Sequence, residues 1–221
     1  MAPEVKFCGL TRAADAAAAA GLGASHAGVI FAGGPRLLTM DRAGEVLAGL
    51  PPTVGRVGVF ADQDPDTVAS FVASVGLTTV QLHAARRPAE LAEVRRVTGA
   101  EVWAVVRVAG GELPAGYEAL AGAADALVVD ALVPGRLGGT GTAVDWEALA
   151  AALERRGRPR RLVLAGGLRP ENVARAVTLL APDVVDVSSG VESAPGIKDH
   201  GLMRRFALAA AGATADSIQP A

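Results

Sequence analysis

The feature that most constrains the fold is the alternation of short apolar runs with helical stretches along the chain. Eight runs rich in β-branched residues recur at intervals of roughly 20 to 35 residues, which is the spacing of strand–helix units. Several of them are apolar without alternation, as expected of strands buried on both faces. The pattern predicts a parallel sheet with helical crossovers. The expected strands are Val5–Cys8, Ala27–Phe31, Arg56–Phe60, Thr79–Leu82, Val102–Val106, Ala126–Val129, Arg161–Leu164 and Val184–Val187.

Helices are predicted between these strands from helix propensity, apolar spacing and start signals. The stretch from Gly110 to Ala124 has the weakest helical pattern. Eight strand–helix units in 221 residues predict an α/β fold, a parallel eight-stranded (β/α)8 or TIM barrel. A doubly wound open sheet is the alternative, but it usually has fewer strands, and Cys8-Gly9-Leu10-Thr11 is not a dinucleotide-binding turn. The expected helices are Arg12–Ala20, Asp41–Ala48, Asp64–Val75, Pro88–Val97, Asp145–Arg156, Pro170–Leu180 and Gly201–Ala211.

Composition and the chain ends limit the possible partners and locations. We expect one domain over residues 1–212 and a small, polar, flexible tail over residues 213–221. A net charge of −2 and an aromatic content of 4% disfavour nucleic acid and anionic membrane as partners. The single cysteine, Cys8, excludes an internal disulfide and favours a reducing compartment. The first residues lack the pattern of a signal peptide. The sequence therefore predicts a soluble, cytoplasmic protein.

The candidate functional residues are the polar and small residues at the carboxyl ends of the strands, where (β/α)8 barrels carry their active sites. The loops after the last two strands commonly bind phosphate, because small residues let backbone N–H groups approach an anion. Ser189 is further expected to lead into a short helix facing that anion. For Gly166 and Gly167, a plain tight turn is the alternative. The candidates are Lys6, Cys8, Arg36, Asp62, Gln81, His83, Arg107, Asp130, Gly166, Gly167, Ser188, Ser189 and Gly190.

Two of these residues could carry acid–base chemistry. Cys8 alone would be a small buried hydrophobe, but a cation such as Lys6 nearby is expected to lower its thiol pKa and permit base chemistry. Asp130 ends an apolar run, and partial burial would raise its pKa and suit it to act as an acid. The alternative for Asp130 is a helix cap or a loop salt bridge.

The remaining candidates are weaker on their own. The guanidinium of Arg36, in a loop at the same end, suits a carboxylate, although a lone arginine is more often a solvated surface residue. A lone histidine such as His83 more often has a structural role than a ligand-binding one. Histidine and cysteine are not placed for a metal, so neither metal nor cofactor is expected. The loop Leu137–Thr142 lacks the ending of a P-loop and suits either a lid over a phosphate or a plain mobile loop.

Taken together and in order, these motifs resemble the phosphoribosylanthranilate isomerase family of the tryptophan pathway. The match runs from Val5 to about Phe206. The resemblance implies the Amadori rearrangement of N-(5-phosphoribosyl)anthranilate, without metal or cofactor, by a monomer or homodimer. The matching segments are Lys6–Thr11, Gly34–Arg36, Val57–Phe60, Val80–His83, Asp130, Gly138–Gly141, Asp145–Trp146, Leu164–Leu168, Pro170–Asn172, Asp186–Glu192 and Pro195–Asp199.

The resemblance also implies a role for each site residue. Asp130 would protonate the furanose ring oxygen and open the ring to a Schiff base, and Cys8 as thiolate would remove the C2′ proton. Arg36 would hold the anthranilate carboxylate, with Lys6 and His83 as further substrate-binding residues. The residues expected to hold the phosphate are Gly141, Gly166, Gly167, Ser189 and Gly190.

Three alternative functions stay open at this point. Phe7, Gly34 and Ala84–Arg87 differ from the usual residues of the family and leave room for a relative that acts on another aryl amine riboside. A histidine-pathway aminosugar isomerase would use two carboxylates, and Cys8 occupies the place of the first. A non-catalytic phosphate-binding barrel would not need the intact pair of Cys8 and Asp130.

Overall fold

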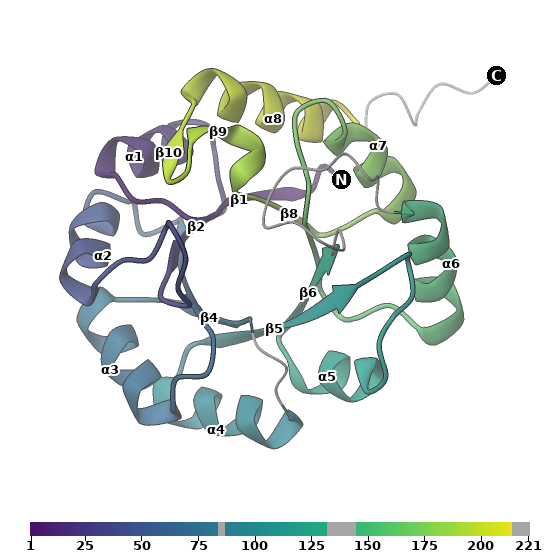
Figure 1. Cartoon of the computed structure of the whole chain (residues 1–221), viewed down its shortest axis with the longest axis horizontal. Coiled ribbons are helices and arrows are strands. Elements are labelled where there is room, and N and C mark those ends of the chain that lie inside the picture. Colours follow the sequence, from purple (N-terminus) through teal and green to yellow (C-terminus); the bar gives the residue numbers. More distant parts are fainter. Residues whose placement is uncertain (84–86, 132–144, 214–221) are drawn as a thin grey trace.

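The expected strands close into a parallel barrel. The computed structural model describes residues 1–83, 87–131 and 145–213, and its strands pair in chain order, with β8 returning to β1 (Figure 1). This confirms the predicted (β/α)8 barrel, and the strand bounds differ from the expected ones by at most two residues, as at the end of β5. The strands are β1 (Glu4–Phe7), β2 (His26–Ile30), β3 (Gly55–Phe60), β4 (Thr79–Leu82), β5 (Glu101–Val108), β6 (Ala126–Ala131), β7 (Leu162–Ala165) and β8 (Val184–Val187).

A ring of helices surrounds the barrel, and their starts follow from capping residues. Asp64, Asp145 and Asp199 each accept the backbone N–H of the residue three positions later, at 2.9 Å. The weakly patterned stretch before β6 does contain a short helix, α5. The helices are α1 (Ala13–Gly21), α2 (Met40–Leu47), α3 (Pro65–Val75), α4 (Pro88–Thr98), α5 (Tyr117–Ala123), α6 (Trp146–Arg156), α7 (Val173–Leu180) and α8 (His200–Gly212).

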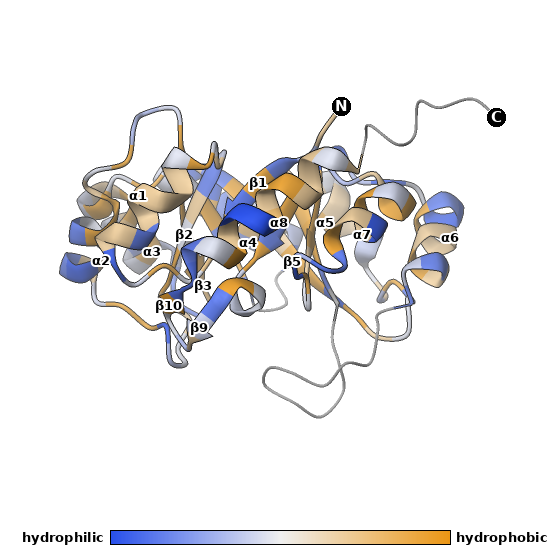
Figure 2. Cartoon of the chain, turned by 90° about the horizontal axis from the view of Figure 1, so that it is seen from above, coloured by the Kyte–Doolittle hydropathy of each residue, from blue (hydrophilic) through white to orange (hydrophobic). Residues whose placement is uncertain are grey.

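Two apolar cores follow from the two faces of the barrel wall. The larger one lies between strands and helices, where for example Phe7 of β1 packs against Phe206 of α8 with ring centroids 6.2 Å apart. Figure 2 shows the complementary pattern, with hydrophilic residues on the outer faces of several helices. The second, smaller core comes from the other face of β5 to β8. Its buried members are Trp103, Val105, Ala126, Val128, Val163 and Val184.

The structure differs from the sequence prediction in two places, the start of α7 and the segment after β8. Helix α7 begins at Val173 and not at Pro170, because the side chain of Asn172 closes the preceding turn by accepting the N–H of Arg169 at 2.7 Å. After β8, the predicted short helix is present as a three-residue 3-10 helix, η1 (Ser189–Val191). It leads into an antiparallel hairpin, β9 (Glu192–Ala194) and β10 (Ile197–Lys198), that the sequence pattern did not reveal.

The hairpin β9–β10 lies at the edge of the molecule opposite the N-terminus (Figure 2). Buried Asp15 of α1 anchors it by accepting the backbone N–H of Lys198 at 3.2 Å. The same carboxylate accepts two hydrogen bonds from Arg12 and contacts Nε2 of His200 at 2.9 Å. These contacts keep the pKa of Asp15 below its usual value although its burial opposes the charge. The hairpin is therefore tied to both α1 and α8.

Some predictions fall outside the described residues. These are the candidate lid Leu137–Thr142, which includes Gly141, and the tail from residue 214 onward. Within the described part of the chain, none of the helices is long and apolar enough to cross a lipid bilayer.

Candidate active site

A pocket of about 240 Å³ opens at the carboxyl ends of the strands and gathers most of the predicted residues. A larger hollow of about 930 Å³ lies at the opposite end, between residues such as Glu4, Glu101 and Arg161, and none of the predicted site residues lines it. The chemistry therefore belongs to the smaller pocket. Its lining residues are Cys8, Ile30, Arg36, Val59, Gln81, His83, Asp130, Gly166, Gly167, Leu168, Asp186, Val187, Ser188, Ser189 and Gly190.

The thiol of Cys8 lies just beyond β1, over Gly28 of β2. A Cβ on Gly28 would come within 3.0 Å of Sγ, so the glycine leaves room for the thiol. Burial raises the pKa of Cys8, and the nearby charges of Lys6 and Lys198 oppose this only in part. The predicted lowering of this pKa was wrong, because the loss of hydration in the barrel mouth outweighs the neighbouring cations.

Lys6 lies beneath the pocket and does not line it. Its side chain is completely buried, and Nζ donates to Oδ2 of Asp186 at 2.7 Å and to Oε1 of Gln81 at 3.0 Å. Burial works against the charged ammonium, but Asp186 and Cys8 outweigh burial and raise the pKa of Lys6. The expected direct substrate contact of Lys6 therefore has no geometric support, and its charge acts on the site from below.

Asp130, at the end of β6, and His83, just after β4, approach each other in the pocket. Oδ2 of Asp130 lies 3.9 Å from Nε2 of His83. Burial raises the pKa of Asp130, in the predicted direction, and burial likewise lowers the pKa of His83. Both shifts favour the neutral forms of the pair. Asp130 can therefore hold a proton at a higher pH than an exposed aspartate would.

The loops after β7 and β8 meet at Gly190. A Cβ on Gly190 would lie 1.9 Å from the carbonyl oxygen of Leu168, so only glycine permits this approach. Gly166 and Gly167 have φ angles of 87° and 66°, which favour glycine as well. With Ser189, these residues form one wall of the pocket, made largely of backbone. Such a wall suits an anion better than an apolar group.

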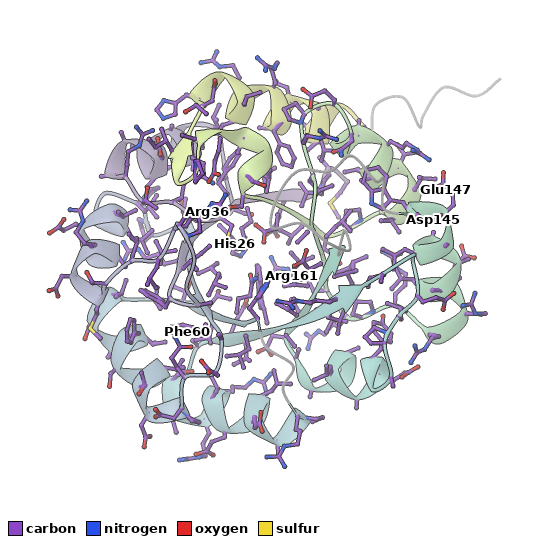
Figure 3. All side chains as sticks on the ribbon, in the orientation of Figure 1. His26, Arg36, Phe60, Asp145, Glu147 and Arg161 are labelled. Carbon is purple, nitrogen blue, oxygen red and sulfur yellow. The ribbon has the colours of Figure 1, made fainter. Side chains whose placement is uncertain are left out.

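Arg36 reaches the pocket from the loop between β2 and α2 (Figure 3). Its Nε and Nη2 donate to the two carboxylate oxygens of Glu192 at 2.7 and 2.6 Å. Nζ of Lys198 donates to Oε1 of the same carboxylate at 2.9 Å and to the carbonyl oxygen of Ser188 at 3.0 Å. Arg36 is thus not the solvated arginine of the alternative interpretation. Its orientation is set by a largely buried partner.

Several residues of the site were missed or left without a role by sequence reasoning. Glu192 and Lys198 lie in two segments that match the family, Asp186–Glu192 and Pro195–Asp199, but no sequence feature assigned either of them a role in the site. Oδ1 of Asp186, Oγ of Ser188 and Nδ1 of His83 are buried without a hydrogen-bond partner among the described residues. Orphaned polar atoms next to a pocket are costly unless a polar ligand or water satisfies them. These atoms are available to a polar ligand or to ordered water in the pocket.

Comparison with known protein families assigns the chain to one family. The family described as N-(5'phosphoribosyl)anthranilate (PRA) isomerase matches residues 5–209. The chain belongs to this family. The match includes every strand from β2 to β8 and all the described residues that line the pocket.

Relatives and solved structures agree with this assignment. The N-(5'-phosphoribosyl)anthranilate isomerase of Paracoccus denitrificans is 44% identical over 93% of this chain and 96% of its own length. That of Thiobacillus denitrificans is 42% identical, covering 93% and 97%. The crystal structure of the PRA isomerase from Thermotoga maritima superimposes with a TM-score of 0.82 at 34% identity, covering 95% of this chain and 99% of that one. A PRA isomerase crystallised with reduced 1-(o-carboxyphenylamino)-1-deoxyribulose 5-phosphate gives 0.80 at 32% identity, with the same coverage.

Proposed function

We propose that this PRA isomerase family member converts N-(5-phosphoribosyl)anthranilate to 1-(2-carboxyphenylamino)-1-deoxyribulose 5-phosphate in tryptophan biosynthesis, with Cys8 as base and Asp130 as acid. Family membership supports the isomerase reaction. The observation that carries the residue roles is that Cys8, at the end of β1, and Asp130, at the end of β6, line one pocket beside the glycine-rich loops. A base and an acid on different strands can reach different atoms of one sugar.

The proposed reaction is an Amadori rearrangement in which the enzyme donates one proton and removes another before the enolamine tautomerises. The protonated carboxyl of Asp130 donates its proton to the furanose ring oxygen, the C1′–O bond breaks, and the nitrogen lone pair forms the Schiff base. The thiolate of Cys8 then removes the C2′ proton, and the electrons of that bond form the enolamine. Tautomerisation of the enolamine gives the ketone product. Neither step needs an oxidant or a reductant, because atoms and electrons are only rearranged within the substrate.

The two anionic ends of the substrate suit two parts of the pocket. We assign the phosphate to the backbone wall of Gly166, Gly167, Ser189 and Gly190, with the predicted contribution of Gly141 in the part of the chain not described. We assign the anthranilate carboxylate to Arg36. His83, which lines the pocket with a partly exposed ring, is left to contact the sugar or Asp130.

Replacing Arg36 with alanine is expected to raise KM by about 10-fold or more and to leave kcat nearly unchanged. A hydrogen bond to a charged group contributes about 1.5–3 kcal/mol, and the carboxylate lies at the unreacting end of the substrate. Steady-state kinetics of the purified variant measure both constants. Arg175→Ala is the matched control, because Arg175 forms an exposed pair with Glu147 on the outer ring. An unchanged KM for Arg36→Ala would place the carboxylate elsewhere.

The dependence of kcat/KM on pH is expected to be a broad plateau with two limbs. The active form holds one proton, on Asp130, and a thiolate at Cys8. Activity falls at low pH as both groups become protonated, through a pKa of Asp130 that burial raises above its ordinary value of about 4. Activity falls at high pH as both groups lose their protons, through a pKa of Cys8 raised above its ordinary value of about 8.5. A decline that begins near pH 7 would contradict the raised thiol pKa.

The direct test of the function is turnover by the purified chain. The labile substrate is generated in the cuvette from anthranilate, and loss of its fluorescence is followed after the protein is added. Turnover establishes the proposed reaction. A folded protein that binds phosphate compounds without turnover would indicate a non-catalytic barrel, and turnover of a different aryl amine riboside alone would redirect the substrate assignment.

Two finer proposals concern the state of the protein in the cell. A reduced Cys8 is required for base chemistry, which fits a cytoplasmic location. The Thermotoga maritima relative is dimeric and has been crystallised as generated monomers. We accordingly expect a monomer or a homodimer, which sedimentation of the purified chain distinguishes.

A further inference from the structure

We propose that Glu192 is a positioning residue that holds the guanidinium of Arg36 in the orientation required by the substrate carboxylate, and that Lys198 keeps Glu192 in place. This inference rests on the contact between Arg36 and the anthranilate carboxylate proposed above. It adds to that contact an internal partner that fixes Arg36 before any substrate arrives.

The contact between Arg36 and Glu192 uses only one edge of the guanidinium. Nε and Nη2 donate to the two carboxylate oxygens in a bidentate arrangement, at 2.7 and 2.6 Å. A guanidinium carries five N–H donors, and among the described residues Nη1 has no hydrogen-bond partner. A second carboxylate can therefore join at the remaining edge while Glu192 stays bound. The Arg36 side chain is 20% exposed and that of Glu192 only 5%, so the pair has one side open to the pocket.

Few side chains surround the part of the loop that leads to Arg36. Gly33 and Gly34, which precede it by three and two residues, have φ angles of 96° and 84°, and a Cβ on either would meet no atom within 4 Å. These two glycines therefore place no side chain beside Arg36 that could restrain it. Below it, a Cβ on Gly9 would come within 2.5 Å of Cδ of Arg36, so the stem lies directly on the backbone of Gly9. Glu192 supplies the remaining restraint at the charged end.

Glu192 is itself held too firmly to be displaced easily. The side chain of Lys198 is fully buried, and its Nζ reaches Oε1 of Glu192 at 2.9 Å. Although burial opposes its charge, Arg36 and Lys198 keep the pKa of Glu192 below its ordinary value, so it is an anion. Its departure from the site would leave a buried ammonium without its carboxylate. The backbone N–H of Lys198 is in turn fixed on Asp15, which ties this support to α1.

In the opposite role, Glu192 would compete with the substrate carboxylate for Arg36 and would leave Arg36 when the substrate binds. The two roles predict opposite effects of a Glu192 substitution on KM. Removing a competitor lowers KM, because the guanidinium becomes free, whereas removing a positioning residue raises KM. The double contact of Glu192 with Arg36 and Lys198 favours the positioning role.

The test is Glu192→Gln, measured by steady-state kinetics in the full chain. We expect KM for N-(5-phosphoribosyl)anthranilate to rise about tenfold, with kcat within about twofold of wild type, because the reacting end of the sugar is not contacted. Glu147→Gln is the matched control, since Glu147 also pairs with an arginine but lies exposed on α6 (Figure 3). The control should change neither constant.

A double-mutant cycle separates positioning from a general structural effect. If Glu192 acts through Arg36, Glu192→Gln causes no further rise of KM in the Arg36→Ala background. Additive effects in the double variant would overturn the proposal, and so would an unchanged or lowered KM in the single variant. If Glu192→Gln does not fold, Glu192→Asp keeps a charge beside Lys198 but shortens the reach to Arg36, and the same rise of KM is expected. Absence of turnover in the wild type would instead refute the proposed function.

Discussion

Replacing Cys8 with serine is expected to lower kcat by at least about 100-fold, the scale of a lost general base. Serine fits the small space over Gly28, but its hydroxyl holds its proton far more tightly than a thiol does. The proton at C2′ would then have no competent acceptor in the pocket. The measurement is kcat at saturating substrate, with anthranilate-sugar fluorescence as the readout.

The control for this variant is a measurement of ligand binding. Cys8→Ser should bind the product or a reduced product analogue nearly as tightly as the wild type, because the phosphate and carboxylate contacts are untouched. Its thermal unfolding midpoint should also stay close to the wild-type value, since the substitution removes little buried volume. A near-wild-type kcat in a protein that passes both controls would exclude Cys8 as the base.

Asp130→Asn is expected to lower kcat by at least about 100-fold, because an amide keeps the shape of the carboxyl group but cannot deliver a proton to the ring oxygen. General acid catalysis contributes about 10²- to 10⁴-fold, and ring opening cannot begin without it. The neighbouring His83 has a pKa lowered by burial, so it is neutral at physiological pH and a poor replacement acid. A kcat within tenfold of the wild type would exclude Asp130 as the acid.

The pH dependence of the Asp130→Asn variant provides a second, independent readout. In the wild type, activity falls at low pH because Asp130 becomes protonated while the Cys8 thiol is protonated as well. In the variant only the thiolate is required, so the residual rate should rise with pH until the raised pKa of Cys8 is passed. If the Asp130→Asn variant keeps the wild-type fall in activity at low pH, a group other than Asp130 titrates in that range.

Local sequence patterns determined the secondary structure closely. Runs such as Val184–Val187 and Thr79–Leu82 are strands with the predicted bounds, because they are rich in β-branched residues, which favour extended backbone. Predictions failed where a side-chain contact, not a propensity, set the boundary. The start of α7 shifted to Val173 because Asn172 closes a turn, which composition cannot distinguish from a first helical turn.

The sequence by itself determined the barrel, the family and the set of strand-end residues that meet in the pocket, because parallel strands in a barrel present all their carboxyl ends on one face. Only the tertiary structure decided how these residues are charged and held. The raised pKa of the Cys8 thiol and the position of Lys6 beneath the pocket depend on burial. The pairing of Arg36 with Glu192 joins residues 156 positions apart. Hydration loss and charge pairing act across space between distant segments, so no local pattern encodes them.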